Sequence, residues 1–242
     1  MIWEVLIAST ITAIFTGFGA IPFFFVYKIN NKWLGIGNAI AAGLMLGASI
    51  GLIFEGLKFS PTRLGVGLIV GFGLIVLARH WLDGRGDLEI ADVTQADLRK
   101  MLLIVGVMTV HSFAEGVGVG VAYGNGQSFG TLITTAIAIH NIPEGLAISL
   151  VLIPRGVSVW RAAGWSVFSS LPQPIMAVLA FLFVLIFHPI LPVGLGLAAG
   201  AMIWMVFREL LPEAIENIPR LTALSALSIA ALAMVGFQLV IG

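Results

Sequence analysis

Long apolar stretches, separated by short groups of charged and turn-forming residues, fill almost the whole sequence. A helix that crosses a bilayer needs about 20 mostly apolar residues, and the chain contains eight such stretches. They cover approximately residues 2–27, 33–57, 62–81, 101–122, 128–153, 162–187, 190–216 and 221–241. The pattern predicts an all-α polytopic membrane protein with eight transmembrane helices. The first stretch is too long for the core of a signal peptide, so we expect it to remain as a membrane span.

The connections between the predicted helices are short, with one exception. Residues 82–99 contain five acidic residues and two arginines. We expect this segment to form a cytoplasmic loop. No other feature divides the sequence, so residues 1–242 are interpreted as a single transmembrane domain.

The composition excludes several classes of protein. Hydrophobic residues make up 59% of the chain and charged residues 10%, with a mean hydropathy of +1.08, whereas soluble domains are usually about 25% charged. A soluble enzyme and a disordered chain are therefore excluded. The 12 basic and 12 acidic residues balance, so no general positive field is present to bind nucleic acid. The sequence has no cysteine, which excludes disulfides and thiolate metal sites.

The distribution of lysine and arginine predicts how the chain is inserted. Nine basic residues lie around the connections after the first, third, fifth and seventh predicted helices: Lys28, Lys32, Arg79, Arg85, Arg99, Lys100, Arg155, Arg161 and Arg220. The other connections hold only Lys58 and Arg63. Because basic residues collect on the cytoplasmic side, we expect both termini to lie outside. The expected location is the inner membrane of a prokaryotic cell.

The fourth and fifth predicted helices carry the same polar motif near their middle. Residues 111–116 read His-Ser-Phe-Ala-Glu-Gly, and residues 140–145 read His-Asn-Ile-Pro-Glu-Gly. Positions i and i+4 lie on one face of a helix, so each motif places an imidazole beside a carboxylate. A short loop makes the two helices antiparallel neighbours. We therefore expect two imidazoles and two carboxylates to surround one point inside the membrane.

Imidazole and carboxylate groups together suit a borderline divalent cation. Such a cation would also compensate the buried acids, because a charge at mid-membrane costs about 2.5–3.5 kcal/mol on insertion scales. The alternative interpretation is that each His–Glu pair forms a hydrogen bond and only ties helices together. Two copies of the motif at matching depth favour the cation site.

These motifs resemble those of the ZIP family of divalent-metal transporters. That family has a His-Asn-x-x-Glu-Gly-like motif in the fourth helix and a His-x-x-Pro-Glu-Gly-like motif in the fifth, and the resemblance covers nearly the whole chain. It implies eight helices in a three-plus-two-plus-three arrangement, with the first and last three related as an inverted repeat. It also implies alternating access, in which helices one, four, five and six move against helices two, three, seven and eight.

By the same resemblance, the chain carries divalent transition metals into the cytoplasm and is not an enzyme. Zn²⁺ is the expected substrate, and Fe²⁺, Mn²⁺, Cd²⁺ and Co²⁺ are alternatives. The expected partners are the metal ion and the lipid bilayer, with no nucleic acid, and a homodimer is one oligomeric state considered.

The resemblance also implies the metal ligands. The first metal position of the family falls here on His111, Glu115, His140 and Glu144. A methionine of the second helix joins this position in the family, and Met45 matches it. The alternative role for Met45 is plain helix packing.

A second metal position of the family falls on Ser112, Asn141 and Gln173. All three side chains are neutral here, whereas the family typically has Asn or Asp at the first two places and Glu at the third. Neutral oxygens bind a divalent cation much less well than carboxylates. We therefore expect one strong metal site and a second that is weak or transient.

Further charged residues lie near the predicted helix ends. Glu209, Glu213 and Glu216 recur at helical spacing near the cytoplasmic end of the seventh helix, where they form either an exit for the ion or an ordinary charged helix end. Arg208 stands where the family often has His, and it cannot bind a metal; pairing with Glu209 is one interpretation. Glu55 ends the second helix as either an outer entrance or a simple interfacial charge.

Two rival functions follow from the same residues. An intramembrane metalloenzyme would need a pattern such as His-Glu-x-x-His, which the sequence lacks. A homologue that binds or senses metal without transport, or a cation channel, remains the alternative because the second metal position is neutral and Arg208 replaces a histidine.

Overall fold

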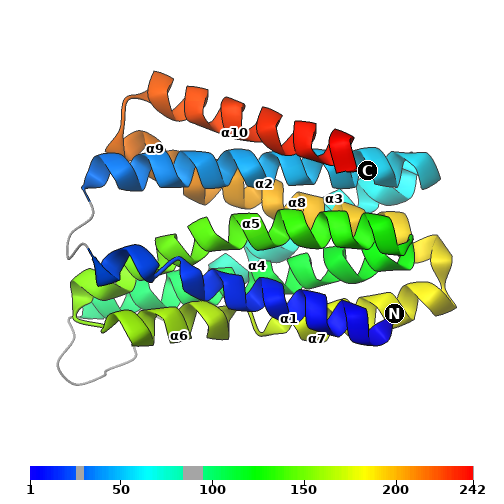
Figure 1. The fold of residues 1–242 in the computed structure, drawn as a ribbon, viewed down its shortest axis with the longest axis horizontal. Coiled ribbons are helices and arrows are strands. Elements are labelled where there is room, and N and C mark those ends of the chain that lie inside the picture. Colours follow the sequence, from blue (N-terminus) through cyan, green and yellow to red (C-terminus); the bar gives the residue numbers. More distant parts are fainter. Residues whose placement is uncertain (26–29, 84–94, 242) are drawn as a thin grey trace.

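Helices form every element of the part of the chain that the structure describes, which comprises residues 1–25, 30–83 and 95–241 (Figure 1). The structure is a computed structural model. Its α-helices are α1 (Ile2–Phe18), α2 (Asn31–Phe59), α3 (Pro61–Asp83), α4 (Gln95–Gly124), α5 (Gln127–Leu152), α6 (Val159–Ser169), α7 (Pro172–Ile186), α8 (Leu191–Met205), α9 (Leu211–Asn217) and α10 (Arg220–Ile241). Short 3₁₀ turns are η1 (Ile21–Phe24), η2 (Ile153–Arg155) and η3 (His188–Ile190), and η4 (Val206–Leu210) is π-helical.

The all-helical prediction with eight spans is confirmed. Eight segments among the described residues are long and apolar enough to cross a membrane: Ile2–Phe24, Asn31–Phe59, Pro61–Trp81, Val105–Gly124, Gln127–Arg155, Val159–Ile186, His188–Asn217 and Arg220–Val240. Large apolar side chains cover the outside; Leu232 of α10, for example, is 72% exposed. The N- and C-termini lie at the same end of the bundle (Figure 1), which we call the terminal end.

Three predicted spans are not single α-helices. The first span, predicted over 2–27, divides into α1 and η1; the sixth, predicted over 162–187, divides into α6 and α7; and the seventh, predicted over 190–216, contains η4. The predicted loop 82–99 was also too long, since α3 continues to Asp83 and α4 begins at Gln95. The remaining connection, 84–94, lies outside the described residues.

Proline accounts for two of these interruptions. A proline lacks the backbone N–H and disfavours helical backbone at the preceding residue, and α7 starts at Pro172 after the break at Ser170 and Leu171. In the seventh span, Pro212 cannot donate to the carbonyl of Arg208, and the π-helical turn η4 directly precedes the helix that contains this proline. Wider π turns of this kind often occur near functional sites.

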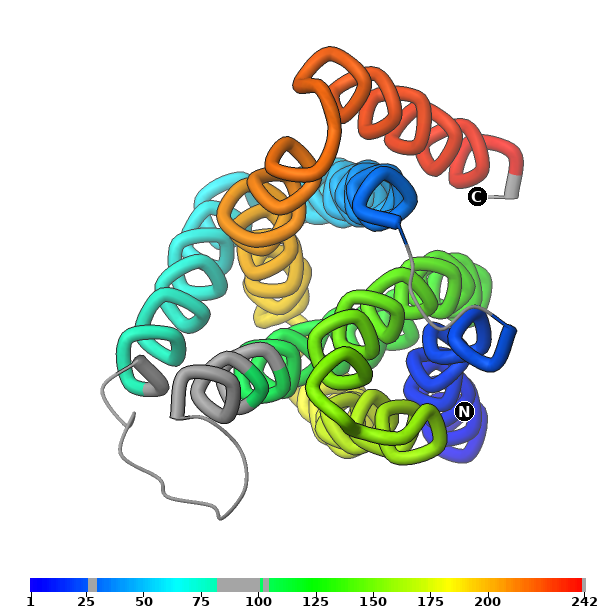
Figure 2. The backbone as a smooth tube through the Cα atoms, turned by 90° about the vertical axis from the view of Figure 1, so that its left-hand side faces the viewer, coloured from blue at the N-terminus to red at the C-terminus, as the bar shows by residue number. Residues whose placement is uncertain are grey.

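The helices form two groups, visible as the lower and upper halves of Figure 1 and again in Figure 2. The α4–α5 group contains α1, α4, α5, α6 and α7, whereas the α2–α8 group contains α2, α3, α8, α9 and α10. The groups meet mainly where α4 contacts α8, where α2 contacts α5 and where α3 contacts α4. The three-plus-two-plus-three arrangement and the inverted repeat stay predictions.

Glycines show that packing within each group differs from packing between them. Within groups, a Cβ on Gly120 of α4 would lie 2.8 Å from the backbone nitrogen of Phe181 in α7, and one on Gly71 of α3 would meet the backbone of α8. Between groups, a Cβ on Gly118 would meet only the Cβ of Ala198, at 2.9 Å. Small residues let helix backbones approach closely, so each group is locked internally by backbone contacts.

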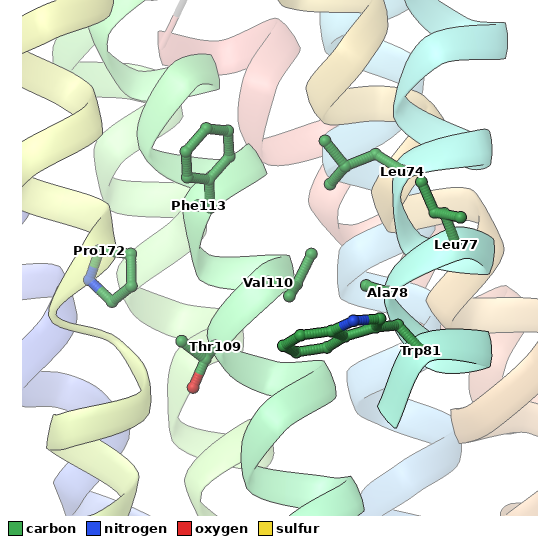
Figure 3. A pocket seen from close by; sticks show the side chains of 8 residues that line it. All are labelled: Leu74, Leu77, Ala78, Trp81, Thr109, Val110, Phe113 and Pro172. Carbon is green, nitrogen blue, oxygen red and sulfur yellow. The ribbon is translucent and has the colours of Figure 1, made fainter. Parts of the chain in front are cut away.

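A crevice also separates the groups where α3 passes α4. It has a volume of about 510 Å³ and is lined by Leu74, Leu77, Ala78, Trp81, Thr109, Val110, Phe113 and Pro172 (Figure 3). The only polar side chain in this lining outside Trp81 is Thr109, whose hydroxyl donates to the carbonyl of Val105 at 2.7 Å. The α3–α4 boundary is therefore apolar and loosely packed.

Candidate metal centre

The four residues of the paired motifs meet in the middle of the α4–α5 group. His111 and Glu115 come from α4, and His140 and Glu144 come from α5. All four side chains are buried, none more than 2% exposed. One ligand atom from each residue lies within 4.8 Å of the other three. The expected convergence of two imidazoles and two carboxylates is therefore present, and we call this set the quartet.

The spacing of the quartet matches what a four-coordinate ion needs. The Nε2 atom of His111 lies 3.4 Å from Glu115 Oε1 and 3.1 Å from Glu144 Oε1. The Nε2 atom of His140 contacts Glu115 Oε1 and lies 3.8 Å from Glu144 Oε1. Tetrahedral ligands at the usual zinc distances of about 2.0–2.2 Å are separated by about 3.3–3.6 Å. Three of these four nitrogen-to-oxygen distances are therefore near the edge length of such a tetrahedron.

The orientation of the side chains argues against two simple His–Glu pairs. His140 Nε2 and Glu115 Oε1 form one hydrogen bond, which joins α5 to α4. Although His111 Nε2 and Glu144 Oε1 are 3.1 Å apart, neither atom has a hydrogen-bond partner among the described residues. Leaving a buried donor or acceptor unpaired costs about 1–3 kcal/mol, and more for a charged group. One hydrogen bond between helices and two unpartnered atoms do not make two separate His–Glu pairs, and a cation among the four atoms would satisfy the two that lack a partner.

The glycine that ends each motif lets a further helix reach the quartet. A Cβ on Gly145 would lie 2.7 Å from the carbonyl carbon of Thr16, so α1 packs directly on the backbone of α5. A Cβ on Gly116 would lie 2.9 Å from the Cα of Gln173, so α7 packs in the same way on α4. Each Glu-Gly pair therefore combines a carboxylate with the contact surface for a supporting helix.

The neutral residues predicted for a second metal position are partly brought together. Gln173 Nε2 donates to Glu115 Oε2 at 3.2 Å, and its Oε1 accepts from Asn141 Nδ2 at 3.4 Å. The Oγ1 atom of Thr12 lies 2.8 Å from the same Gln173 oxygen. Ser112 is buried, but its hydroxyl has no hydrogen-bond partner in the described part of the chain. The amides of Gln173 and Asn141 and the hydroxyl of Thr12 thus form a hydrogen-bonded network beside the quartet.

Thr12 is a site residue that the sequence interpretation missed. Its backbone carbonyl also accepts from Asn141 Nδ2 at 2.9 Å, so α1 contributes to the polar network through both main chain and side chain. A usable signal was present, because Ser9, Thr12 and Thr16 recur at helical spacing in the first span and are all buried. Thr16 meets Ser170, at the break in the sixth span, at 2.8 Å.

The predicted additional ligand Met45 is fully buried on α2, in the hydrophobic core. Ser49, one turn further along, donates to the Met45 carbonyl at 2.8 Å. The role of Met45 as a metal ligand stays a prediction.

The acidic residues of the seventh span are divided between two elements, and their role as an exit stays a prediction. The π-helical η4 contains Glu209, which is ion-paired with Arg79 of α3, whereas Glu213 and Glu216 follow on α9. The interpretation that Arg208 pairs with Glu209 is therefore replaced by the Arg79 pair, and Arg208 is exposed. A charge partner 130 residues away leaves no signal in local spacing.

Comparisons with known proteins show the family of this chain. A model of the ZIP zinc transporter family matches residues 82–241. The chain belongs to the ZIP family. A candidate zinc transporter of Arabidopsis thaliana is 46% identical over 90% of this chain, and zinc transporter ZIPB of Bordetella bronchiseptica is 33% identical over 93% of it and matches over 75% of its own length. Human zinc transporter ZIP11 is 36% identical over 48% of this chain.

The matched part covers only 36% of the length of the Arabidopsis and human ZIP relatives. ZIP family membership together with eight apolar helices identifies the chain as an integral multi-pass membrane protein, and the ZIP family consists of zinc transporters rather than enzymes. Orientation and host membrane stay predictions.

Proposed function

We propose that this protein transports Zn²⁺ across a membrane and that the quartet holds the ion midway. The observation that carries the proposal is the convergence of four buried ligand atoms within 4.8 Å of one another. Two ionised carboxylates and two neutral imidazoles balance the charge of one divalent cation. Because ligands must lose protons to bind metal, zinc binding should release protons.

The surroundings of the histidines support a site that releases its ion. In tightly bound metal centres the second ring nitrogen usually donates to a carboxylate or carbonyl, and loss of such a partner typically lowers affinity 10–100-fold. Here Nδ1 of both His111 and His140 is buried without a hydrogen-bond partner among the described residues. A weaker hold is what a transported ion needs, whereas a structural site would gain from the missing hydrogen bonds.

The two helix groups provide the parts for alternating access. The quartet belongs wholly to the α4–α5 group, and the α2–α8 group faces it. Backbone-to-backbone contacts at glycines hold each group together, while Gly37, Gly118 and Gly194 meet only side chains across the boundary. We therefore propose that the α4–α5 group moves as a body against the α2–α8 group. The bias of basic residues supports a terminal end that faces outside and zinc movement into the cytoplasm.

Uptake by reconstituted protein tests this function. Radioactive Zn²⁺ should enter proteoliposomes that contain the wild-type chain, and Fe²⁺, Mn²⁺, Cd²⁺ and Co²⁺ measured in parallel would rank the alternatives. A homologue that only binds or senses metal would take up zinc onto the protein with no accumulation in the lumen. A channel would give a flux that does not saturate at low metal concentration.

The neutral network predicts a gain of metal binding in one variant. Gln173→Glu would place a second carboxylate 3.2 Å from Glu115 Oε2, and two such charges repel unless a cation lies between them. We expect the variant to bind two zinc ions per chain where the wild type binds one, measured by elemental analysis after equilibrium dialysis. Gln173→Leu, which removes the amide without adding charge, should stay at one. A folded Gln173→Glu protein that still binds one ion would contradict the expected role of charge at the second position.

A further inference from the structure

A mainly apolar cavity that contains a few polar side chains lies at the terminal end, away from the quartet. It has a volume of about 840 Å³ and is bounded by α2, α5, α10 and the turn between α4 and α5. Its lining includes Glu55, Lys58, Asn125 and Gln238. Because α2 belongs to one helix group and the α4–α5 turn to the other, this cavity stands across the boundary between the groups.

Glu55 links the two groups inside this cavity. Its Oε1 accepts from Asn125 Nδ2 at 2.8 Å, and its Oε2 lies 2.6 Å from Lys58 Nζ. Lys58 lies three residues after Glu55 on the same helix, and their ion pair therefore does not join different helices. The Asn125 hydrogen bond, by contrast, ties the α4–α5 turn to α2. The Glu55 side chain is 15% exposed, so an ion in the cavity can reach it.

We infer that Glu55 binds an arriving divalent cation and that this binding displaces Asn125, releasing the α4–α5 turn from α2. The inference rests on the proposed function and adds an outer binding residue to it. The displacement follows from charge, because a divalent cation attracts the carboxylate more strongly than a neutral amide does. Since Lys58 already pairs with Oε2, the cation would bind Oε1, the oxygen that Asn125 now holds. The cation also offsets the loss of a hydrogen bond with a stronger interaction.

Along α2 and α5, a thin apolar layer lies between the residues that line this cavity and the level of the quartet. Ala48 of α2, Ala136 of α5 and Met234 of α10 pack together as one buried cluster. Ala48 precedes Ser49 and lies one turn from Met45, and Ala136 lies one turn before His140, so the layer is about one helical turn, or roughly 5 Å, thick. The α4–α5 turn leads into α5, which carries Ala136 nine residues after its start at Gln127, roughly 14 Å along the helix. Loosening the turn therefore acts on the helix that supplies one side of this layer.

Hydrogen exchange of the α4–α5 turn, measured on the whole protein in lipid nanodiscs, tests the release. Added Zn²⁺ should speed exchange of the peptide around Asn125 about tenfold, the effect of losing one hydrogen bond to a charged group. Glu55→Gln keeps an oxygen acceptor for Asn125 but has no charge, so zinc should leave its exchange unchanged. Lys58→Gln keeps the carboxylate and should respond at a lower zinc concentration.

The response should persist in Glu144→Gln, in which the quartet is disabled, so a failure of the quartet is distinguishable from a failure of this inference. Equal effects of zinc on exchange in the wild type and in Glu55→Gln would overturn the inference. It would also be overturned if exchange of the wild-type turn stayed unchanged at zinc concentrations that saturate the response of Lys58→Gln.

Thiol labelling tests whether release opens the path. The chain has no cysteine, and Ser49 is fully buried between the cavity and Met45, so Ser49→Cys introduces one reporter of nearly unchanged size. Adding Asn125→Ala, which removes the bond to Glu55, should speed labelling by a membrane-impermeant maleimide about tenfold. Adding Lys58→Gln instead should leave the rate as it was. Equal labelling of the Asn125→Ala and Lys58→Gln proteins would show that the bond does not keep the path closed.

Discussion

Replacing Glu144 with alanine should lower zinc uptake into proteoliposomes by at least about 100-fold while leaving the protein folded. Glu144 supplies one of the four ligand atoms, and losing even a hydrogen-bond partner of a ligand typically costs 10–100-fold in metal affinity. The fold should survive, because Glu144 Oε1 makes no hydrogen bond within the described residues. Glu144→Gln, which keeps the size of the side chain, should lose uptake equally.

Thermal unfolding with and without zinc separates binding from folding in these variants. At a zinc concentration about 100 times the dissociation constant, binding should stabilise the wild type by about 2.7 kcal/mol, and Glu144→Ala should show no such gain. Glu4→Ala removes a carboxylate that is 48% exposed at the start of α1 and should match the wild type. If Glu144→Ala took up zinc as fast as the wild type, Glu144 would not be part of the transport site.

Replacing Gly145 with alanine should destabilise the protein by about 3 kcal/mol or more. The new methyl group would lie within 2.7 Å of the Thr16 carbonyl carbon, and backbone atoms of two packed helices cannot rotate away as a side chain can. Overpacking usually costs about 1–3 kcal/mol and sometimes more. Because α1 supports α5 beside Glu144, uptake should fall as well. Thermal unfolding in detergent and zinc uptake measure the two effects.

Two other glycines serve as matched controls for Gly145. An alanine methyl group at Gly164 of α6 would have nothing within 4 Å, and at Gly37 of α2 its nearest neighbour would be Leu146 Cδ2 at 3.4 Å. Gly164→Ala should be neutral or stabilising by up to about 1 kcal/mol, the helix propensity gain, and Gly37→Ala should be tolerated. If Gly145→Ala had the same melting temperature as Gly164→Ala, the close packing of α1 on α5 would be contradicted.

The sequence was sufficient to predict the quartet, because its two halves are local. His111 with Glu115 and His140 with Glu144 are each four residues apart on one helix, and a short turn makes those helices antiparallel neighbours. Periodicity and loop length alone therefore bring the four side chains together. The eight spans were equally accessible, since length and apolarity define a transmembrane helix.

The breaks inside spans and the long-range partners were not accessible in the same way. Hydropathy does not detect the interruption before Pro172, because the residues on both sides are apolar. The ion pair between Arg79 and Glu209 joins residues far apart in sequence, and Thr12 reaches Gln173 only because α1 packs against both α5 and α7. Such contacts depend on which helices are neighbours, which composition and spacing do not encode.

Anomalous diffraction from crystals soaked in zinc at low concentration tests the central claim most directly. We predict one strong peak inside the membrane region, within bonding distance of His111, Glu115, His140 and Glu144. Absence of a peak among these four residues would contradict the transport site. Two peaks of equal occupancy would contradict the single strong position that the neutral Gln173 and Asn141 predict.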